Sequence, residues 1–252
     1  MSEGAIETRL ENGVAAITFS HPKGNALPRQ QLTRLTETID EYGHNDDTRV
    51  ILLQSSGDGA FCAGAYFGDL LAVENKEEGK HFFMGFANLI NTMRTIPKLI
   101  VTRVHGRTVG GGVGLVAASD YAIATEAASV RLSELQLGIG PFVVGPAIRR
   151  KMGVQGLTAL SLDAASWKSA HWAYNKELYT ELMESDDDLV KRTNKLANQL
   201  ARYNPLAMKE IKRAFWDDAT HWDNLLEIRA DISGRLLMTE YAQDKLSDIK
   251  KS

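Results

Sequence analysis

The chain has 252 residues, of which 44% are hydrophobic and 24% charged, a balance typical of a globular protein rather than a disordered one. Its 29 basic and 32 acidic side chains leave a net charge of −3, which gives no support to a nucleic-acid partner. The single cysteine, Cys62, excludes an internal disulfide framework, and no apolar run approaches the roughly 20 residues of a membrane helix, so we expect a soluble, cytoplasmic protein without a bound metal.

Strands and helices are predicted to alternate through most of the chain. Two β-rich runs at residues 6–10 and 14–19 flank an Asn-Gly step, which indicates a hairpin. Apolar side chains at helical spacing predict helices at 29–42 and 76–94. Further buried strands are expected at 50–53, 99–104 and 121–124. This alternation predicts an α/β fold with parallel strand pairing.

From about residue 186 the pattern changes to helices alone. Leucine and isoleucine recur there at helical spacing, and no strand is expected after residues 178–181. We therefore divide the chain into a core at 1–186 and a C-terminal helical region at 187–252.

Two loops rich in small residues each follow a buried strand. Residues 63–65 and 110–112 would let the backbone come close to a ligand, because their side chains are small or absent. A backbone N–H from each loop could then bind one developing oxyanion. The alternative is that these glycines only close turns and ease the packing of helix on strand.

Four sequence motifs in order resemble the crotonase family, the enoyl-CoA hydratases and isomerases. They are HPKGNAL, AFCAGA, VHGRTVGGGVGL and SELQLGI. The resemblance implies a crotonase-like spiral of ββα units that binds acyl-CoA, with a C-terminal helical region that builds a homotrimer or a dimer of trimers. It also implies that coenzyme A enters as part of the substrate and that no separate cofactor is needed.

By motif position, the resemblance implies that the N–H groups of Ala65 and Gly111 bind the thioester carbonyl oxygen. Negative charge develops on that oxygen when a proton leaves the neighbouring carbon, so two such donors stabilise the enolate. The residues expected to contact the acyl chain or the CoA portion are Lys23, Ala26, Leu27, Ala63, Tyr66, Phe67 and Gly110.

The acid–base residue departs from the hydratase pattern. Family hydratases carry one glutamate three residues after the oxyanion glycine and a second one 20 further on; these positions are Gly114 and Glu134 here. Water addition uses two carboxylates, whereas shifting a double bond needs a single base. The segment from Glu134 to Phe142 also resembles the mitochondrial enoyl-CoA isomerases, which keep only this glutamate. The sequence therefore predicts an isomerase with Glu134 as its single acid/base.

Apolar residues around Glu134 are expected to raise its pKa toward neutrality by burial. These residues are Leu135, Leu137, Ile139 and Phe142. Replacing Gly114 by glutamate is expected to restore some hydration.

Other functions stay open at this point. A hydratase that works with one glutamate is the main alternative, followed by an inactive acyl-CoA-binding homologue. A serine peptidase is not favoured, because no serine has a matched histidine and aspartate. We expect Cys62 to be a small buried core residue rather than a nucleophile.

Overall fold

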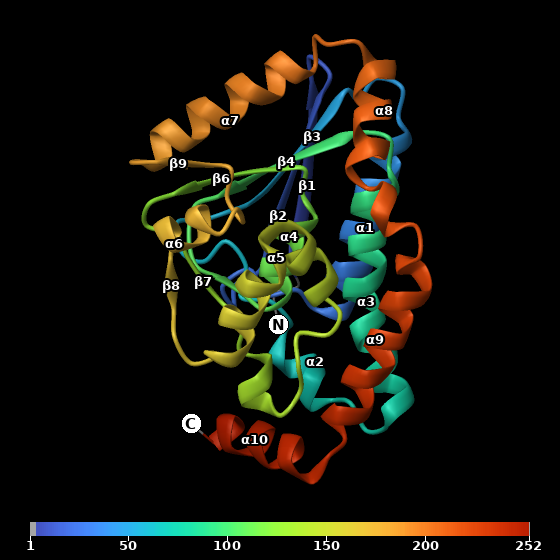
Figure 1. The fold of residues 1–252 in the computed structure, drawn as a ribbon, viewed down its shortest axis with the longest axis vertical. Coiled ribbons are helices and arrows are strands. Elements are labelled where there is room, and N and C mark those ends of the chain that lie inside the picture. The colour runs from blue at the N-terminus through green and yellow to red at the C-terminus, as the bar shows by residue number, and fades with distance from the viewer. Residues whose placement is uncertain (1–3, 252) are drawn as a thin grey trace.

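A computed structural model describes residues 4–251 and builds them around a twisted six-stranded sheet (Figure 1). The strand order is β1-β2-β3-β4-β6-β9, and only the β1–β2 pair is antiparallel. The strands are β1 (Ala5–Glu11), β2 (Val14–Ser20), β3 (Val50–Ser55), β4 (Leu99–Val104), β6 (Tyr121–Thr125) and β9 (Glu181–Met183). The predicted α/β class with parallel pairing is confirmed.

The hairpin and the first helix form for local reasons. Asn12 and Gly13, with φ angles of 52° and 80°, make the turn between β1 and β2, as the Asn-Gly step predicted. Leu32, Leu35 and Ile39 repeat at helical spacing and are fully buried, so α1 (Arg29–His44) lays one apolar face on the core.

A second, three-stranded sheet carries one wall of the cavity described below. Its order is β5-β7-β8, with strands at Thr108–Val109, Ser129–Arg131 and Lys168–Ser169. Besides α1, the helices described before β9 are α2 (Phe67–Leu71), α3 (Lys76–Thr95), α4 (Gly111–Ala118), the 3-10 turn η1 (Glu134–Leu137), α5 (Gly145–Leu162) and α6 (Ala170–Asn175).

Between β9 and residue 251 the regular elements are all helices, as the sequence indicated. They are α7 (Asp186–Leu200), α8 (Pro205–Phe215), the short η2 (Asp217–Ala219), α9 (Trp222–Leu237) and α10 (Glu240–Lys251). Between residues 4 and 251, no helix combines the length and the apolar character that crossing a bilayer would require.

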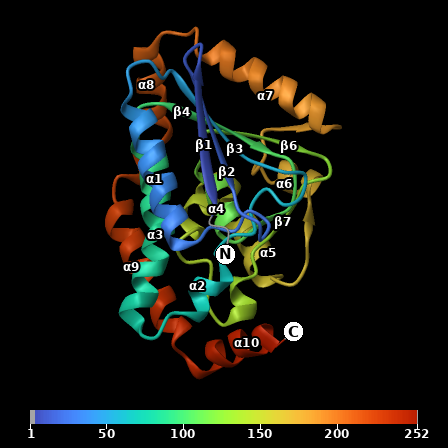
Figure 2. The ribbon, with the colours of Figure 1, turned by 180° about the vertical axis from the view of Figure 1, so that it is seen from behind.

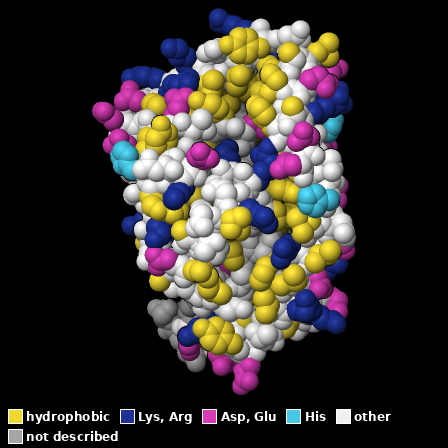
Figure 3. All heavy atoms as spheres, viewed as in Figure 1, with side chains coloured by type: hydrophobic (Ala, Val, Ile, Leu, Met, Phe, Trp, Pro, Cys, Tyr) yellow, Lys and Arg dark blue, Asp and Glu magenta, His cyan; other side chains and the backbone are white. Residues whose placement is uncertain are grey.

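These late helices cover the protomer's own core. Ala197 of α7 packs with Val50, Leu52 and Val101 on one face of the large sheet. On the other flank α1, α3 and α9 lie side by side (Figure 2). Hydrophobic side chains also gather on the surface toward the end where α7 and α8 meet (Figure 3), where Leu206 is 71% exposed. That residues 187–252 join subunits in a trimer stays a prediction.

The contact between α3 and α9 depends on two glycines. A Cβ on Gly79 would lie 2.9 Å from the Cα of Gly234, and a Cβ on Gly234 would lie 2.4 Å from the backbone nitrogen of Lys80. Both distances are too short for a side chain, so the two helix backbones touch at this crossing.

A buried ion pair fixes α8 to the sheet. The Asp120 carboxylate accepts hydrogen bonds from Lys212 Nζ at 2.6 Å, from Trp216 Nε1 at 3.0 Å and from the backbone N–H of Ile100 at 2.8 Å. The side chains of Asp120 and Lys212 are only 5% and 2% exposed. The aspartate, which directly precedes β6, therefore ties α8 and the residue after it to β4.

Candidate active site

A cavity of about 560 Å³ lies where α3, the segment after β7 and the two loops rich in small residues come together. We call these two loops, at residues 63–65 and 110–112, the glycine-rich loops. Most of the cavity lining is apolar, which suits an acyl chain. Nine of the predicted site residues line it: Lys23, Ala26, Ala63, Ala65, Tyr66, Phe67, Gly110, Gly111 and Glu134. Residues from four separate parts of the sequence are thus brought to one place.

The two glycine-rich loops are joined by backbone hydrogen bonds. The N–H of Cys62 donates to Arg107 O at 3.2 Å, and the N–H of Val109 donates to Cys62 O at 2.9 Å. Gly64 has a φ of +81°, and a Cβ there would lie 2.7 Å from Val109 O and 3.2 Å from the nitrogen of Gly111. Only glycine permits this approach. The first loop therefore lies directly against the start of α4.

The N–H groups of Ala65 and Gly111 are available at this contact. Within residues 4–251 neither of them donates a hydrogen bond to another backbone or side-chain atom. Gly111 opens α4, so its N–H points out of the helix with no intrahelical acceptor. A helix N-terminus also carries partial positive charge, which favours an oxyanion.

Glu134 begins η1, and its carboxylate lies beside the same loop. Its Oε1 is 3.0 Å from the place that a Cβ on Gly110 would take. Its Oε2 is buried and has no hydrogen-bond partner among the described residues. Burial raises the pKa of the Glu134 carboxyl to about 7, opposed only by a hydrogen bond with the residue's own backbone. A carboxylate of this kind is a competent base near neutral pH.

The apolar surroundings of Glu134 differ in one residue from those expected. Leu137, Ile139 and Phe142 line the cavity beside it, as predicted. Leu135 does not, because its side chain is 47% exposed and faces away from the cavity. Its assignment as a burying neighbour was wrong, since the 3-10 geometry of η1 turns this position outward.

Leu27 also lies away from the cavity. Its side chain is fully buried and is not part of the cavity lining. Its backbone instead supports the loop: the Leu27 N–H donates to Gly64 O at 2.8 Å, and Leu27 O accepts from the N–H of Tyr66 at 3.2 Å. It therefore holds the two residues that flank Ala65.

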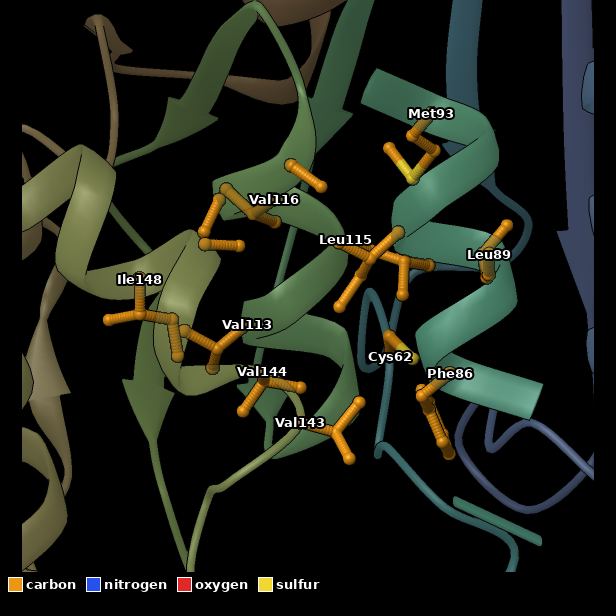
Figure 4. Close-up of a cluster of buried hydrophobic side chains, with 14 of the residues drawn as sticks. Cys62, Phe86, Leu89, Met93, Val113, Leu115, Val116, Val143, Val144 and Ile148 are labelled. Atoms are coloured by element: carbon orange, nitrogen blue, oxygen red, sulfur yellow. The ribbon is translucent and has the colours of Figure 1, made fainter. Parts of the chain in front are cut away.

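The position of the absent first glutamate is filled by another side chain. A Cβ on Gly114 would lie 2.4 Å from Val144 Cγ1 and 2.8 Å from Val144 Cβ. Val143 and Val144 lie next to α4 (Figure 4), and Phe86 of α3 packs against Gly111 at the start of α4. Gly114 is thus required by packing, and the sequence gives no sign of this because its partner lies 30 residues away, in a loop without periodicity.

Gly114→Glu is therefore expected to destabilise the protein rather than to restore hydration. Forcing a longer side chain into a filled core costs about 1–3 kcal/mol, before the cost of burying a carboxylate. Urea unfolding of the variant would measure the loss. The double variant Gly114→Glu/Val144→Gly removes the obstructing side chain, with Val144→Gly alone as its control. A Gly114→Glu protein as stable as the native one would contradict this packing argument.

Several residues that line the cavity were not predicted from the sequence. Phe86 packs on Gly111 so closely that a Cβ there would lie 2.1 Å from Phe86 Cε1. Phe83 and Phe86 share one face of α3, and their helical spacing was a visible signal. Ser233 enters the cavity from α9, and Arg131 enters from the end of β7. Neither has a local pattern that marks it.

The chain is similar to known proteins of one family. The family model described as enoyl-CoA hydratase/isomerase matches residues 9–247. A carnitinyl-CoA dehydratase of Proteus mirabilis is 31% identical over 224 residues, covering 83% of this chain and 80% of that protein. A human mitochondrial 3-hydroxyisobutyryl-CoA hydrolase is 30% identical over 164 residues, covering 60% of this chain and 42% of the other.

Solved structures share the fold. The crystal structure of an enoyl-CoA hydratase from Bacillus halodurans superposes with a TM-score of 0.89, covering 96% of this chain and 99% of that one at 21% identity. An enoyl-CoA hydratase from Mycobacterium avium gives 0.86 at the same identity. At this identity the likeness shows the fold alone, and it confirms the crotonase-like architecture.

Proposed function

Because the chain belongs to the enoyl-CoA hydratase/isomerase family, we propose that it moves a double bond within an enoyl-CoA thioester, with Glu134 as its single acid/base. One observation carries the proposal: Glu134 is the only carboxylate that lines the cavity in the described part of the chain. It lies beside the loop of Gly110 and Gly111 with a pKa raised to about 7. A single base of this strength suits proton transfer between two carbons.

The proposed reaction transfers one proton. The thioester carbonyl oxygen accepts hydrogen bonds from the N–H groups of Ala65 and Gly111. Glu134 removes a proton from the α carbon of a β,γ-enoyl thioester, and the electron pair delocalises into a dienolate whose charge rests on that oxygen. The protonated Glu134 then returns the proton to the γ carbon, which leaves the double bond between the α and β carbons. One such oxyanion donor is worth about 2.7–4 kcal/mol in acyl-transfer enzymes.

A second candidate is addition or removal of water. The relative from Proteus mirabilis, named a carnitinyl-CoA dehydratase, favours it. This chain would have to supply the second proton-transfer group by another route, since Val144 fills the space next to Gly114. An acyl-CoA-binding protein without activity would have no use for an unpaired buried carboxylate, which costs stability when ionised.

Isomerisation and hydration are distinguished by measuring both reactions with acyl chains of the same length. We expect the rate of isomerisation of a 3-enoyl-CoA to exceed the rate of hydration of the matching 2-enoyl-CoA by at least about tenfold. The reason is that the cavity offers one carboxylate, which is enough for isomerisation, whereas hydration uses two. Absorbance of the conjugated thioester follows both reactions. Fast hydration without isomerisation would establish the second candidate, whereas tight CoA-thioester binding without either reaction would indicate a binding protein.

A further inference from the structure

Arg131 is a cation in the wall of an otherwise largely apolar cavity. It ends β7, three residues before Glu134. In the part of the chain that the structure describes, no carboxylate lies within ion-pair distance of its guanidinium, and no acceptor receives a hydrogen bond from it. Its Nε is buried without a partner. An arginine keeps its charge at any physiological pH, and the buried Nε–H of Arg131 has no acceptor among these residues.

Trp167 packs against one face of the Arg131 guanidinium and leaves its edge accessible. Arg131 Cζ lies 4.6 Å from the centroid of the indole ring, because Val130 pairs with Lys168 and the next residues of the two strands meet. The ring covers one face of the guanidinium, so the N–H donors at its edge remain available. A planar edge of parallel N–H groups matches a carboxylate, which it binds through two hydrogen bonds.

We propose that Arg131 selects substrates whose acyl chain ends in a carboxylate, that is, CoA thioesters of unsaturated dicarboxylic acids. The inference rests on the proposed function, since it concerns the acyl chain that Glu134 would act upon. An alkyl chain packed against the guanidinium would displace water from it and offer no acceptor in return, which is costly for a charged group. A terminal carboxylate satisfies both the charge and the planar donors.

The chain offers a matched control in Arg107. Its Cζ lies 5.3 Å from the centroid of the same Trp167 ring, and it too has no carboxylate within ion-pair distance among the described residues. Arg107 is absent from the cavity lining. Substituting each arginine by methionine keeps the length of the side chain and removes the charge, so the two variants separate a contact with the acyl chain from packing against tryptophan.

Binding of saturated thioesters tests the proposal without requiring turnover. Adipyl-CoA and hexanoyl-CoA differ only in a terminal carboxylate or methyl group, and glutaryl-CoA with valeryl-CoA repeats the comparison one carbon shorter. By titration calorimetry we expect the native protein to prefer the diacid thioester by about 10–100-fold. Arg131→Met should abolish this preference, whereas Arg107→Met should keep it.

Three results would overturn the inference. The native protein could bind both members of each pair equally, or the two methionine variants could lose the preference to the same extent. Alternatively, Arg131→Met could weaken both ligands alike and change the sedimentation coefficient, which would assign the guanidinium to a carboxylate of a second copy of this chain. Failure of isomerisation would leave these binding results unchanged, so it is distinguishable from failure of this inference.

Discussion

Glu134→Gln is expected to lower kcat/KM for isomerisation by about 10³-fold while leaving the Kd for a CoA thioester nearly unchanged. Glutamine keeps the size and the hydrogen-bonding capacity of the side chain but cannot accept the proton, and a positioned general base contributes about 10²–10⁴-fold. The oxyanion donors at Ala65 and Gly111 belong to the backbone, so the variant retains them. Steady-state rates and calorimetric binding to the same protein sample measure the two effects.

The pH profile is the control for this variant. The base must be ionised to act, and burial raises the pKa of Glu134 to about 7, so the native rate should rise with pH through this value and then level off. The residual activity of Glu134→Gln should lack this rise. If the variant kept more than about a tenth of native activity with the same profile, another group would be the base.

Asp120→Ala is expected to lower the free energy of unfolding by about 3–5 kcal/mol, the usual cost of removing one partner from a buried ion pair. The substitution leaves Lys212 charged and buried, with Met93 O as its remaining acceptor at 2.7 Å. It also removes the acceptors of Trp216 Nε1 and of the Ile100 N–H. Loss of α8 from the core should follow.

Urea unfolding followed by tryptophan fluorescence measures this loss. Asp231→Ala is the matched control, because Asp231 forms an exposed pair with Arg235 at 3.0 Å, and such pairs contribute at most about 1 kcal/mol. Equal destabilisation by the two substitutions would show that the buried pair is no stronger than a surface one.

Features that arise from neighbouring residues could be predicted from the sequence. The turn at Asn12 and Gly13 depends on two residues that tolerate positive φ, and α1 follows from the spacing of its leucines. The site residues depended on motifs: Glu134 and the two loops were assigned through the family resemblance, and the cavity then brought them together.

Features that join distant residues could not be predicted in this way. Gly114 looks like a position emptied of function until Val144 is found in the same space. Arg131 and Trp167 meet only because β7 pairs with β8, and Lys212 reaches Asp120 across 92 residues. In each case the path of an intervening segment decides the contact, and no short pattern encodes that path.

The crossing of Gly79 over Gly234 determines when the cavity can be completed during folding. α3 supplies Phe83 and α9 supplies Ser233 to its wall, although residues 96–221, half of the chain, lie between the two helices. Closing so long a loop costs entropy before the contact returns any stability, and contacts between distant residues slow folding. During synthesis α3 therefore emerges long before α9, and the apolar side chains that α9 buries stay exposed until α9 has been made. A side chain at Gly79 or Gly234 should therefore lower the folding rate and the yield of folded protein more than it lowers the activity of the folded enzyme.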